Sequence, residues 1–226
     1  GAEAIGFLGP ATDAELIALL DQYFQALNLK EIELKLNSLG CDKCRPSYRQ
    51  SLLEYLEKNK NQLCQDCQRR MERNPLRVLD CKNENCKKVV RLAPSPADYL
   101  CLDCAKHFEG LKNLLQKLKI SYQIDQHLVR GLDYYTRTVF EFQAKSGLGA
   151  QNTVCAGGRY DNLIRQLGGP QTPAIGFALG LERLAILLQE KIPKEKLSLR
   201  PDIFLVFADQ AGYDFAFKLL FSLRKK

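Results

Sequence analysis

The sequence contains no tryptophan and a single methionine. No apolar run approaches the roughly 18 residues that a membrane-spanning helix needs, and no charged-then-apolar leader precedes the rest of the chain. These absences argue against a membrane protein and give no sign of secretion. An apolar content of 46% with 26% charged residues also argues against disorder. We therefore expect a soluble, cytoplasmic protein without a membrane partner.

The single methionine lies at position 71, and the chain begins with Gly1. Because an unprocessed translation product begins with methionine, we expect the sequence to be a piece of a longer protein. Its 226 residues suffice for one large domain or for a domain with a smaller lobe.

Positive charge exceeds negative charge by seven, and much of the excess lies in residues 58–91, where ten basic residues face four acidic ones. Such clustering points weakly toward an anionic partner. An ordinary solvated surface is an equally good interpretation, and both stay open here.

Nine cysteines, eight of them in four close pairs, form the strongest local signal. The pairs are Cys41 with Cys44, Cys64 with Cys67, Cys81 with Cys86, and Cys101 with Cys104. A gap of two to four residues lets two thiolates face one tetrahedral ion, and a second pair completes the site. The pattern predicts two structural zinc sites but not which pairs share an ion. The remaining cysteine, Cys155, is expected to be a small core residue.

Other interpretations of the cysteines remain open. A disulfide framework needs an oxidising compartment, for which the sequence gives no signal, and the thiols could also hold no metal. His107 follows Cys104 by three residues and could replace a cysteine ligand, although it is also an ordinary residue for a helix. Two all-thiolate zinc sites would lower the formal net charge from +7 to about +3, which weakens the charge argument for nucleic acid.

Apolar spacing predicts the elements of the first part of the chain. Residues 13–27 predict an amphipathic helix that begins with a capping box of Thr12 and Glu15. Its expected buried stripe consists of Leu16, Leu19, Leu20, Tyr23 and Leu27. Residues 31–36 alternate between apolar and charged side chains and predict a half-exposed strand.

The second half of the chain is expected to contain more strands. The expected strands are 135–143, 152–156, which the glycines at 157 and 158 would end, and a buried strand at 202–208. The expected helices are 108–118, 160–167, 213–223 and a helix that ends at 188 and follows the apolar segment 174–180.

Residues 41–104 have a different pattern, with short helices between cysteine-bearing turns, and Pro46 fits the first turn of one helix. We expect this stretch to be a small lobe inserted into a larger fold. The predicted division is a first part of the core at 1–40, the lobe at 41–104, a second part of the core at 105–190, a linker at 191–201 and the start of another domain at 202–226.

Three segments carry the functional signal. They are LVRGLDYYTRTVFE at 128–141, CAGGRYD at 155–161 and GFALGLERL at 176–184. Singly they would indicate a strand, a glycine turn and the start of a helix. In this order and spacing they closely resemble the two histidine signatures and motif 3 of the histidyl-tRNA synthetases, which are class II aminoacyl-tRNA synthetases. Residues 1–6 resemble the tail of motif 2.

The resemblance covers essentially the whole chain and implies an α+β fold, in which a class II antiparallel sheet is flanked by helices and carries a helical, cysteine-rich insertion. It implies an enzyme that uses ATP and Mg²⁺ to convert histidine into histidyl-adenylate and then transfers histidine to tRNA(His). Residues 202–226 would begin an anticodon-binding domain. Motif 1, the first part of motif 2 and most of that domain have no counterpart here. Because motif 1 forms much of the dimer interface in the family, we expect a homodimer for the full-length protein and little or no activity for this piece alone.

The resemblance also implies roles for single residues. Arg130 matches the catalytic arginine, whose guanidinium can hold the histidine carboxylate and the α-phosphate together. The expected substrate-binding residues are Glu3, Tyr134, Tyr135, Gly157, Gly158 and Tyr160. Glu3 and Tyr135 match positions that contact the imidazole, and the two glycines would let the backbone approach the substrate. The expected ATP-binding residues are Gly180, Glu182 and Arg183, the last of which matches the arginine that packs on adenine.

Two rival functions remain. A non-catalytic relative, such as the synthetase-like regulatory subunit of histidine biosynthesis or a histidine-sensing kinase domain, generally loses the histidine signatures and the arginines. Here Arg130, Tyr135, Tyr160 and Arg183 are all present. A zinc-supported RNA-binding module would instead bind through residues 58–91, without dependence on ATP. Its expected contacts are Arg69, Arg70 and Arg73.

Overall fold

The computed structural model describes residues 1–129, 131–149, 151–189 and 201–225. The chain forms two units, Gly1–Leu188 and Gln189–Lys226, and each is described by itself. The predicted catalytic residue Arg130 and nearly all of the predicted linker at 191–201 lie outside the described residues.

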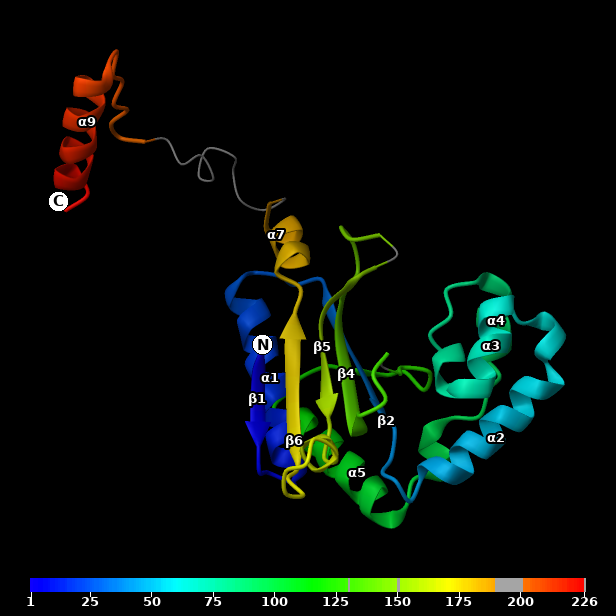
Figure 1. The fold of residues 1–226 in the computed structure, drawn as a ribbon. Coiled ribbons are helices and arrows are strands. Elements are labelled where there is room, and N and C mark those ends of the chain that lie inside the picture. The colour runs from blue at the N-terminus through cyan, green and yellow to red at the C-terminus, as the bar shows by residue number, and fades with distance from the viewer. Residues whose placement is uncertain (130, 150, 190–200, 226) are drawn as a thin grey trace. The chain divides into compact units, whose positions relative to one another are not determined.

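The first unit contains, in the part of the chain that is described, one six-stranded sheet (Figure 1). In sheet order its strands are β1 (Ala2–Ile5), β6 (Ala174–Leu179), β5 (Thr153–Arg159), β4 (Thr136–Ala144), β2 (Ile32–Ser38) and β3 (Gln123–Ile124). Neighbouring strands are antiparallel, except that β2 and β3 are parallel. The predicted α+β class is therefore confirmed, with one short parallel strand at the edge.

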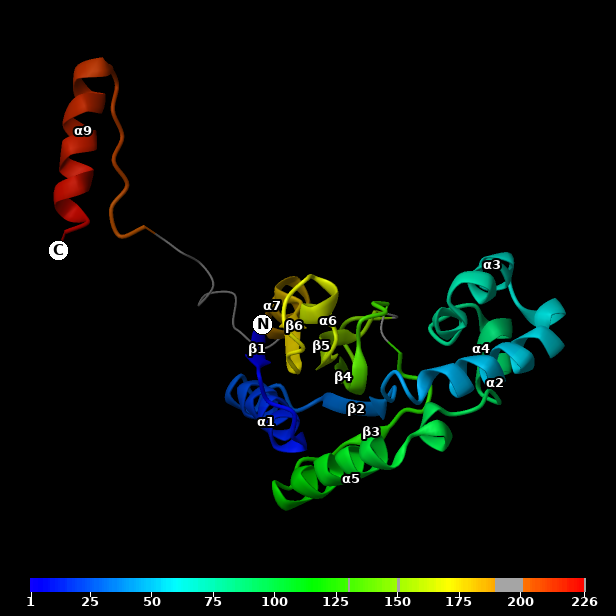
Figure 2. The ribbon, with the colours of Figure 1, turned by 60° about the horizontal axis from the view of Figure 1, so that its bottom comes forward.

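Two helices, α1 (Pro10–Ala26) and α5 (Leu102–Lys117), lie on the same side of the sheet (Figure 2). Side chains alternate between the two faces of a strand. In β4, Phe140 and Phe142 accordingly join the buried cluster that includes residues of α1 and α5, while Glu141 between them points to the other face. Helices α1 and α5 thus cover one face of the sheet, and Glu141 lies on the opposite face.

Helix α1 begins at Pro10 rather than at the predicted residue 13, and its N-cap is Gly9. Proline is tolerated there because its φ is preset and its missing N–H needs no partner. The predicted capping box was wrong, since Thr12 lies inside the helix. The predicted stripe was also partly wrong, because Leu19 and Tyr23 are 50% and 40% exposed. The buried residues are Asp13, Ala14, Leu16, Ile17, Leu20 and Phe24.

The glycines of the second signature lie within β5 and do not end a strand, as had been predicted. A side chain at Gly157 would collide with Phe140 and Phe177, and one at Gly158 would collide with the ring of Tyr135. Close packing on both faces of the sheet therefore requires these glycines. After β5, the helix predicted at 160–167 is shorter, at α6 (Leu163–Gln166), and α7 (Leu181–Gln189) follows β6.

The cysteine-rich stretch forms a group of short helices at one side of the sheet (Figure 1). These helices are α2 (Arg45–Lys58), η1 (Lys60–Gln62), α3 (Gln65–Arg73), η2 (Pro75–Val78), α4 (Glu84–Val90) and η3 (Pro96–Tyr99). Their buried cluster includes Leu52, Leu56 and Met71 and continues through Tyr135 and Val139 to the β4 strand. The boundaries of an inserted lobe at 41–104 stay a prediction.

In the second unit, α9 (Gln210–Leu223) is capped by Asp209, whose Oδ1 accepts a hydrogen bond from the backbone N–H of Gly212 at 2.7 Å. The strand predicted at 202–208 is not formed, and Phe204 and Val206 are each 81% exposed. A strand needs a neighbour to pair its backbone groups, and the described residues of this unit offer none. None of the helices that the structure describes is long and apolar enough to cross a membrane.

Candidate functional site

Glu3, Tyr134, Tyr135 and Tyr160 meet beside the face of the sheet opposite α1 and α5. The hydroxyl of Tyr160 donates a hydrogen bond to Oε2 of Glu3. The ring centroid of Tyr134 lies 4.7 Å from that of Tyr135 and 5.9 Å from that of Tyr160. The structure therefore brings together four of the residues that the sequence predicted to bind substrate, although Glu3 and Tyr160 are 157 positions apart.

The protonation of Tyr160 follows from its surroundings. Burial and the adjacent Glu3 carboxylate raise the pKa of Tyr160. The phenol therefore stays protonated at neutral pH and donates its proton to Glu3. Its oxygen keeps free lone pairs, and the exposed Glu3 has a second carboxylate oxygen. The pair can thus accept hydrogen bonds from N–H groups of a ligand.

Gly176 makes room for Glu3. The two residues are paired between β1 and β6, and any side chain at Gly176 would collide with the Glu3 carboxylate. Gly158 lies opposite Gly176 on β5 and on the same face, while alternation places Gly157 on the helix-covered face. Sequence reasoning did not assign Gly176, whose only signal is a glycine within an apolar strand. Contacts of Gly157 and Gly158 with a substrate stay a prediction.

A cavity of about 660 Å³ adjoins β4, β5 and β6, a size in the range of small-molecule sites. The predicted ATP-binding residues Gly180 and Arg183 lie in its wall, and the exposed Glu182 does not. The Arg183 guanidinium donates hydrogen bonds to the backbone carbonyl of Thr153 and, at 3.1 Å, to Oε1 of Gln151. These contacts hold a planar cation at the cavity wall.

Further polar residues of this wall were missed by sequence reasoning. Oε2 of the buried Glu141 accepts hydrogen bonds from Nε2 of Gln143 at 2.9 Å and from Oγ1 of Thr153 at 2.8 Å. Nε2 of His127 is buried and has no hydrogen-bond partner among the described residues. Positive charge in the wall comes from Lys82, Lys87, Arg91 and Arg183. The available signal in the sequence was Glu141, an acid between two phenylalanines at the end of the first signature.

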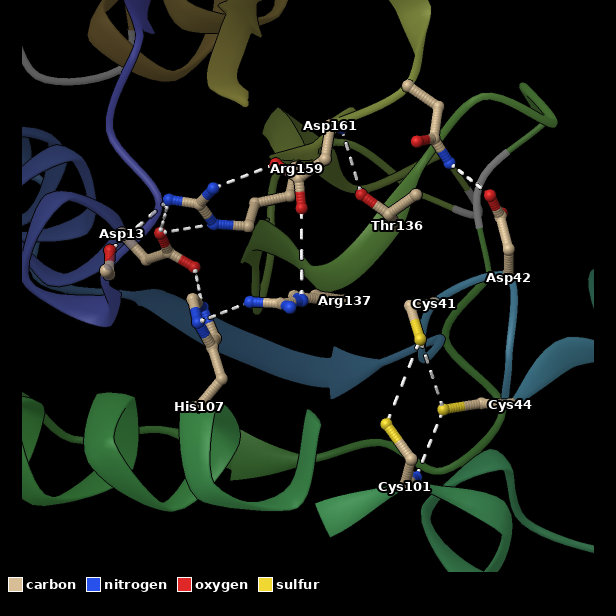
Figure 3. Close-up of polar contacts among 12 residues, drawn as sticks. Asp13, Cys41, Asp42, Cys44, Cys101, His107, Thr136, Arg137, Arg159 and Asp161 are labelled. Carbon is tan, nitrogen blue, oxygen red and sulfur yellow. Dashed lines mark hydrogen bonds and ion pairs between the residues drawn. The ribbon is translucent and has the colours of Figure 1, made fainter. Parts of the chain in front are cut away.

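A buried polar network lies on the helix-covered side of the sheet (Figure 3). Nε and Nη2 of Arg159 both lie 2.8 Å from Oδ1 of Asp13. Nε2 of His107 lies 2.8 Å from Oδ2 of the same carboxylate. The side chains of Asp13 and Arg159 are fully buried. His107, considered from the sequence as a metal ligand, belongs to this network and to neither cysteine cluster.

The network extends toward the second signature. Nη1 of Arg159 donates to Oδ1 of Asp161 at 2.9 Å, and Nε of Arg137 lies 3.9 Å from Oδ2 of that carboxylate. Nη1 of Arg137 also lies 3.4 Å from Nδ1 of His107. Because arginine can only donate, Nδ1 of His107 accepts, and the proton of a neutral imidazole is on Nε2, facing Asp13.

Asp13 and Arg159 form an ion pair at neutral pH. Burial would raise the pKa of Asp13, but hydrogen bonds with His107 and Arg159 outweigh it and lower the pKa. Burial would also lower the pKa of Arg159, but the Asp13 carboxylate raises it. Both groups therefore keep their charges inside the protein.

The lowered pKa of Asp13 predicts a specific loss of stability in acid. The ion pair stabilises the fold fully above the unfolded pKa of about 3.9, and this contribution is lost as the pH falls through the lower native pKa. The measurement is the free energy of unfolding in urea between about pH 7 and pH 3. In acid, this free energy is expected to fall less steeply for Asp13→Asn than for the wild type. The exposed Asp98→Asn is the control. Equal acid slopes for wild type and Asp13→Asn would contradict the prediction.

The eight paired cysteines converge as two sets of four Sγ atoms, each set within 4.8 Å. The neck cluster consists of Cys41, Cys44, Cys101 and Cys104. The lobe cluster consists of Cys64, Cys67, Cys81 and Cys86. The first cysteine pair of the sequence therefore joins the last pair, and the two middle pairs join each other.

The spacing of the sulfur atoms fits a four-coordinate metal. Sγ of Cys41 lies 3.7 Å from that of Cys44 and 3.8 Å from that of Cys101, and Sγ of Cys64 lies 3.9 Å from that of Cys81. Four sulfurs at about 2.3 Å from a tetrahedral zinc ion are about 3.8 Å apart, whereas a disulfide requires about 2.05 Å. All nine cysteines are free, so the disulfide framework considered from the sequence is not formed.

Each cluster includes a cysteine at the N-cap of a helix, Cys64 for α3 and Cys101 for α5. The backbone amide of Cys67 at the start of α3 lowers the pKa of Cys64 to about 7. At the start of α5, the amide of Cys104 lowers the pKa of Cys101 to about 7. Burial instead raises the pKa of Cys67 and Cys104. Four thiolates therefore coexist in a cluster only with a compensating cation.

Comparison with known proteins identifies the family. A family model described as histidyl-tRNA synthetase matches residues 1–184. The chain belongs to the histidyl-tRNA synthetase family. A histidine–tRNA ligase of Acetivibrio thermocellus is 49% identical over 226 residues, which are 100% of this chain and 54% of that protein. The chain thus spans about half the length of the curated relatives it matches.

Solved structures agree with this assignment. The structure of apo histidyl-tRNA synthetase from S. aureus matches with a TM-score of 0.67 and 36% identity, and the match covers 99% of this chain and 55% of that one. A structure from Bacillus halodurans C, described as an ATP phosphoribosyltransferase regulatory subunit/histidyl-tRNA synthetase, matches with a TM-score of 0.51 and 21% identity over 83% of this chain and 51% of that one. The second match shows the shared fold alone.

Proposed function

We propose that the chain is part of a histidine–tRNA ligase, which activates histidine with ATP and transfers it to tRNA(His). The observation that carries the proposal is the Glu3–Tyr160 pair among the signature tyrosines, on a sheet whose cavity wall contains Arg183. Family membership supports the same chemistry. The test is histidine-dependent ATP–pyrophosphate exchange by the full-length protein.

Recognition of histidine is assigned to the acceptor groups beside the tyrosines. The free lone pairs of Tyr160 and the second oxygen of Glu3 can accept from the single N–H of a neutral imidazole or from both N–H groups of an imidazolium, and the rings of Tyr134 and Tyr135 supply an apolar wall. An analogue without a ring N–H would leave these acceptors unpaired, which penalises binding. The pair therefore selects histidine over apolar amino acids of similar size.

Replacing Glu3 by glutamine is expected to raise the KM for histidine in pyrophosphate exchange by about 10- to 100-fold, because a hydrogen bond to a charged acceptor is lost. The KM for ATP should stay within about twofold. The matched control is Glu15→Gln, an exposed carboxylate on α1. An unchanged KM for histidine would remove Glu3 from recognition.

Adenylate formation requires two anions, the histidine carboxylate and the α-phosphate, to approach each other. Arg130 is assigned to hold oxygens of both and to stabilise the charge that develops between them. The carboxylate is already ionised at neutral pH, so no side-chain base is needed. Arg183 is assigned to the adenine face and the outer phosphates of ATP, with Gly180 and Glu182 beside it. Mg²⁺ would accompany ATP and neutralise its phosphates.

The two cysteine clusters are assigned to structural zinc, because the sulfur spacing and the all-thiolate donor set fit a closed tetrahedral site. Elemental analysis of protein purified without chelator is expected to give about two zinc ions per chain. Cys104→Ser should lower the count to about one, and Cys67→Ser should do the same. Cys155→Ser, outside both clusters, is the control. A folded protein with no bound metal would contradict the assignment.

Several wider properties follow from the proposal and await tests of their own. The full-length protein is a cytoplasmic homodimer, residues 202–226 begin an anticodon-binding domain, and residues 41–104 form an inserted lobe. Because residues 1–226 span about half of the matched ligases, the chain by itself is expected to show little or no aminoacylation.

A second candidate function is RNA binding by the cysteine-rich helices. The supporting observation is a hollow of about 740 Å³ on α3 and η2. Its lining consists of Arg69, Arg70, Arg73 and Arg77 together with the acidic Asp66, Glu72 and Asp133 and with Asn74. This candidate predicts tRNA binding that is independent of ATP and weakens when Arg69, Arg70 and Arg73 are neutralised together. Binding that survives the triple substitution would exclude it.

The regulatory or histidine-sensing alternative makes a different prediction. Such a protein would bind histidine without supporting pyrophosphate exchange. Histidine binding by the full-length protein, with no histidine-dependent exchange under any condition tested, would favour this alternative over the ligase.

A further inference from the structure

The chain leaves the sheet for the cysteine-rich helices after β2 and returns from them at the start of α5, and these two connections lie next to each other. Cys41 and Cys44 lie between the end of β2 and the start of α2, and Cys101 and Cys104 lie at the start of α5. All four Sγ atoms converge in the neck cluster. A metal held there would fix the N-terminal end of α5 relative to the sheet.

One turn further along α5, His107 contacts Asp13 of α1. This imidazole is 6% exposed and uses both ring nitrogens, Nε2 toward Asp13 at 2.8 Å and Nδ1 toward Arg137 at 3.4 Å. Its orientation is therefore determined by contacts on both sides, and the position of α5 is transmitted to the Asp13 carboxylate (Figure 3).

Asp13 in turn holds Arg159, which supports both halves of the Glu3–Tyr160 pair. Arg159 Nη2 donates to the carbonyls of Phe7 at 2.8 Å and Gly9 at 3.3 Å, in the segment that follows the strand carrying Glu3. Its Nη1 donates to Asp161 at 2.9 Å. Tyr160 therefore lies between Arg159 and Asp161, whose side chains are hydrogen-bonded to each other.

We infer that His107 is a positioning residue of the histidine pocket, acting through Asp13 and Arg159, and that the neck cluster holds His107 in place. The inference rests on the proposed function, because it gives the Glu3–Tyr160 pair the role of binding the imidazole. His107 touches no substrate atom; it keeps the acceptor groups at the separation that the ligand requires. Displacement of a binding group by about 1 Å can cost up to about 100-fold.

The experiment is isothermal titration of the full-length protein with histidine in the absence of ATP, together with the KM values for histidine and ATP in exchange. His107→Leu introduces an apolar side chain of similar volume and loses both polar contacts, and its Kd for histidine is expected to rise by about tenfold. His107→Gln can still donate to Asp13 and accept from Arg137, and it should restore most of the affinity. The exposed neighbour Lys106→Leu is the control.

A purely structural role predicts a different result. His107→Leu would then lower the melting temperature and the fraction of binding-competent protein but leave the Kd and the KM for histidine unchanged, and that outcome overturns the inference. An equal rise in the KM for ATP would also overturn it, since the network supports the histidine side. If the wild type binds no histidine, the proposed function itself has failed.

The contribution of the neck cluster is tested separately. Cys104→Ser is expected to remove about one metal ion per chain and to raise the Kd for histidine by about as much as His107→Leu. Cys67→Ser removes a ligand of the lobe cluster, which is not among the contacts that connect the neck cluster to His107. It should raise the Kd for histidine much less. Equal effects of the two cysteine variants, or no effect of Cys104→Ser, would show that the neck cluster does not act on the pocket.

Discussion

Arg130→Ala is expected to lower histidine-dependent ATP–pyrophosphate exchange by the full-length protein by about 10²- to 10³-fold. The removed guanidinium is assigned to hold the attacking carboxylate and the α-phosphate together, and loss of one preorganised charge-stabilising donor has effects of this size. The loss should appear mainly in kcat, because the interaction strengthens as charge develops in the transition state.

Two comparisons make this result specific. Arg130→Lys keeps the charge but loses the planar fork, so it should recover only part of the rate. The exposed Arg165→Ala removes an arginine from α6 and should leave exchange unchanged. Equal exchange rates for wild type and Arg130→Ala would remove Arg130 from the mechanism.

Arg159→Leu is expected to lower the free energy of unfolding by about 3–5 kcal/mol, because it leaves the buried Asp13 carboxylate without its charged partner. The backbone carbonyls of Phe7 and Gly9 also lose their donor. Urea unfolding at neutral pH measures the change. Arg165→Leu, at an exposed position, should stay within about 0.5 kcal/mol of wild type.

A double-mutant cycle separates the ion pair from the packing of the side chain. Asp13→Asn combined with Arg159→Leu removes the uncompensated charge, so the double variant should be more stable than the sum of the single effects predicts. If the two changes in the free energy of unfolding simply add, the Asp13–Arg159 ion pair contributes no coupling energy.

The sequence predicted the fold class because the signatures are long and their spacing is specific, and it predicted that Glu3 and the tyrosines share a site through the same resemblance. Secondary structure predicted from local sequence patterns was less accurate where tertiary packing determines the conformation. The glycines at 157 and 158 resembled a turn signal, but they lie in a strand because Phe140, Phe177 and Tyr135 occupy the space of their missing side chains.

The buried network was not predicted, although the chain contained a signal for it. Asp13 has helical spacing with Ile17, Leu20 and Phe24 on the buried face of α1. A carboxylate on such a face requires a buried partner, but the sequence does not identify Arg159, which lies 146 positions away. Such a partner is determined only by the three-dimensional fold.

The pairing of the cysteines depends on topology in the same way. Spacing alone identified the ligand pairs, but the neck cluster joins Cys41 to Cys101 across 60 positions, because α5 returns to the sheet beside the start of α2. The strand predicted at 202–208 failed for the opposite reason, since its apolar pattern has no partner strand among the described residues of its unit.

The most direct test of the account is ATP–pyrophosphate exchange by the full-length wild-type protein with each of the common amino acids supplied singly. We expect exchange with histidine and none above background with the others, because the acceptors of Glu3 and Tyr160 are paired by the N–H of an imidazole ring held between the tyrosines. No exchange with histidine, or comparable exchange with another amino acid, would contradict it.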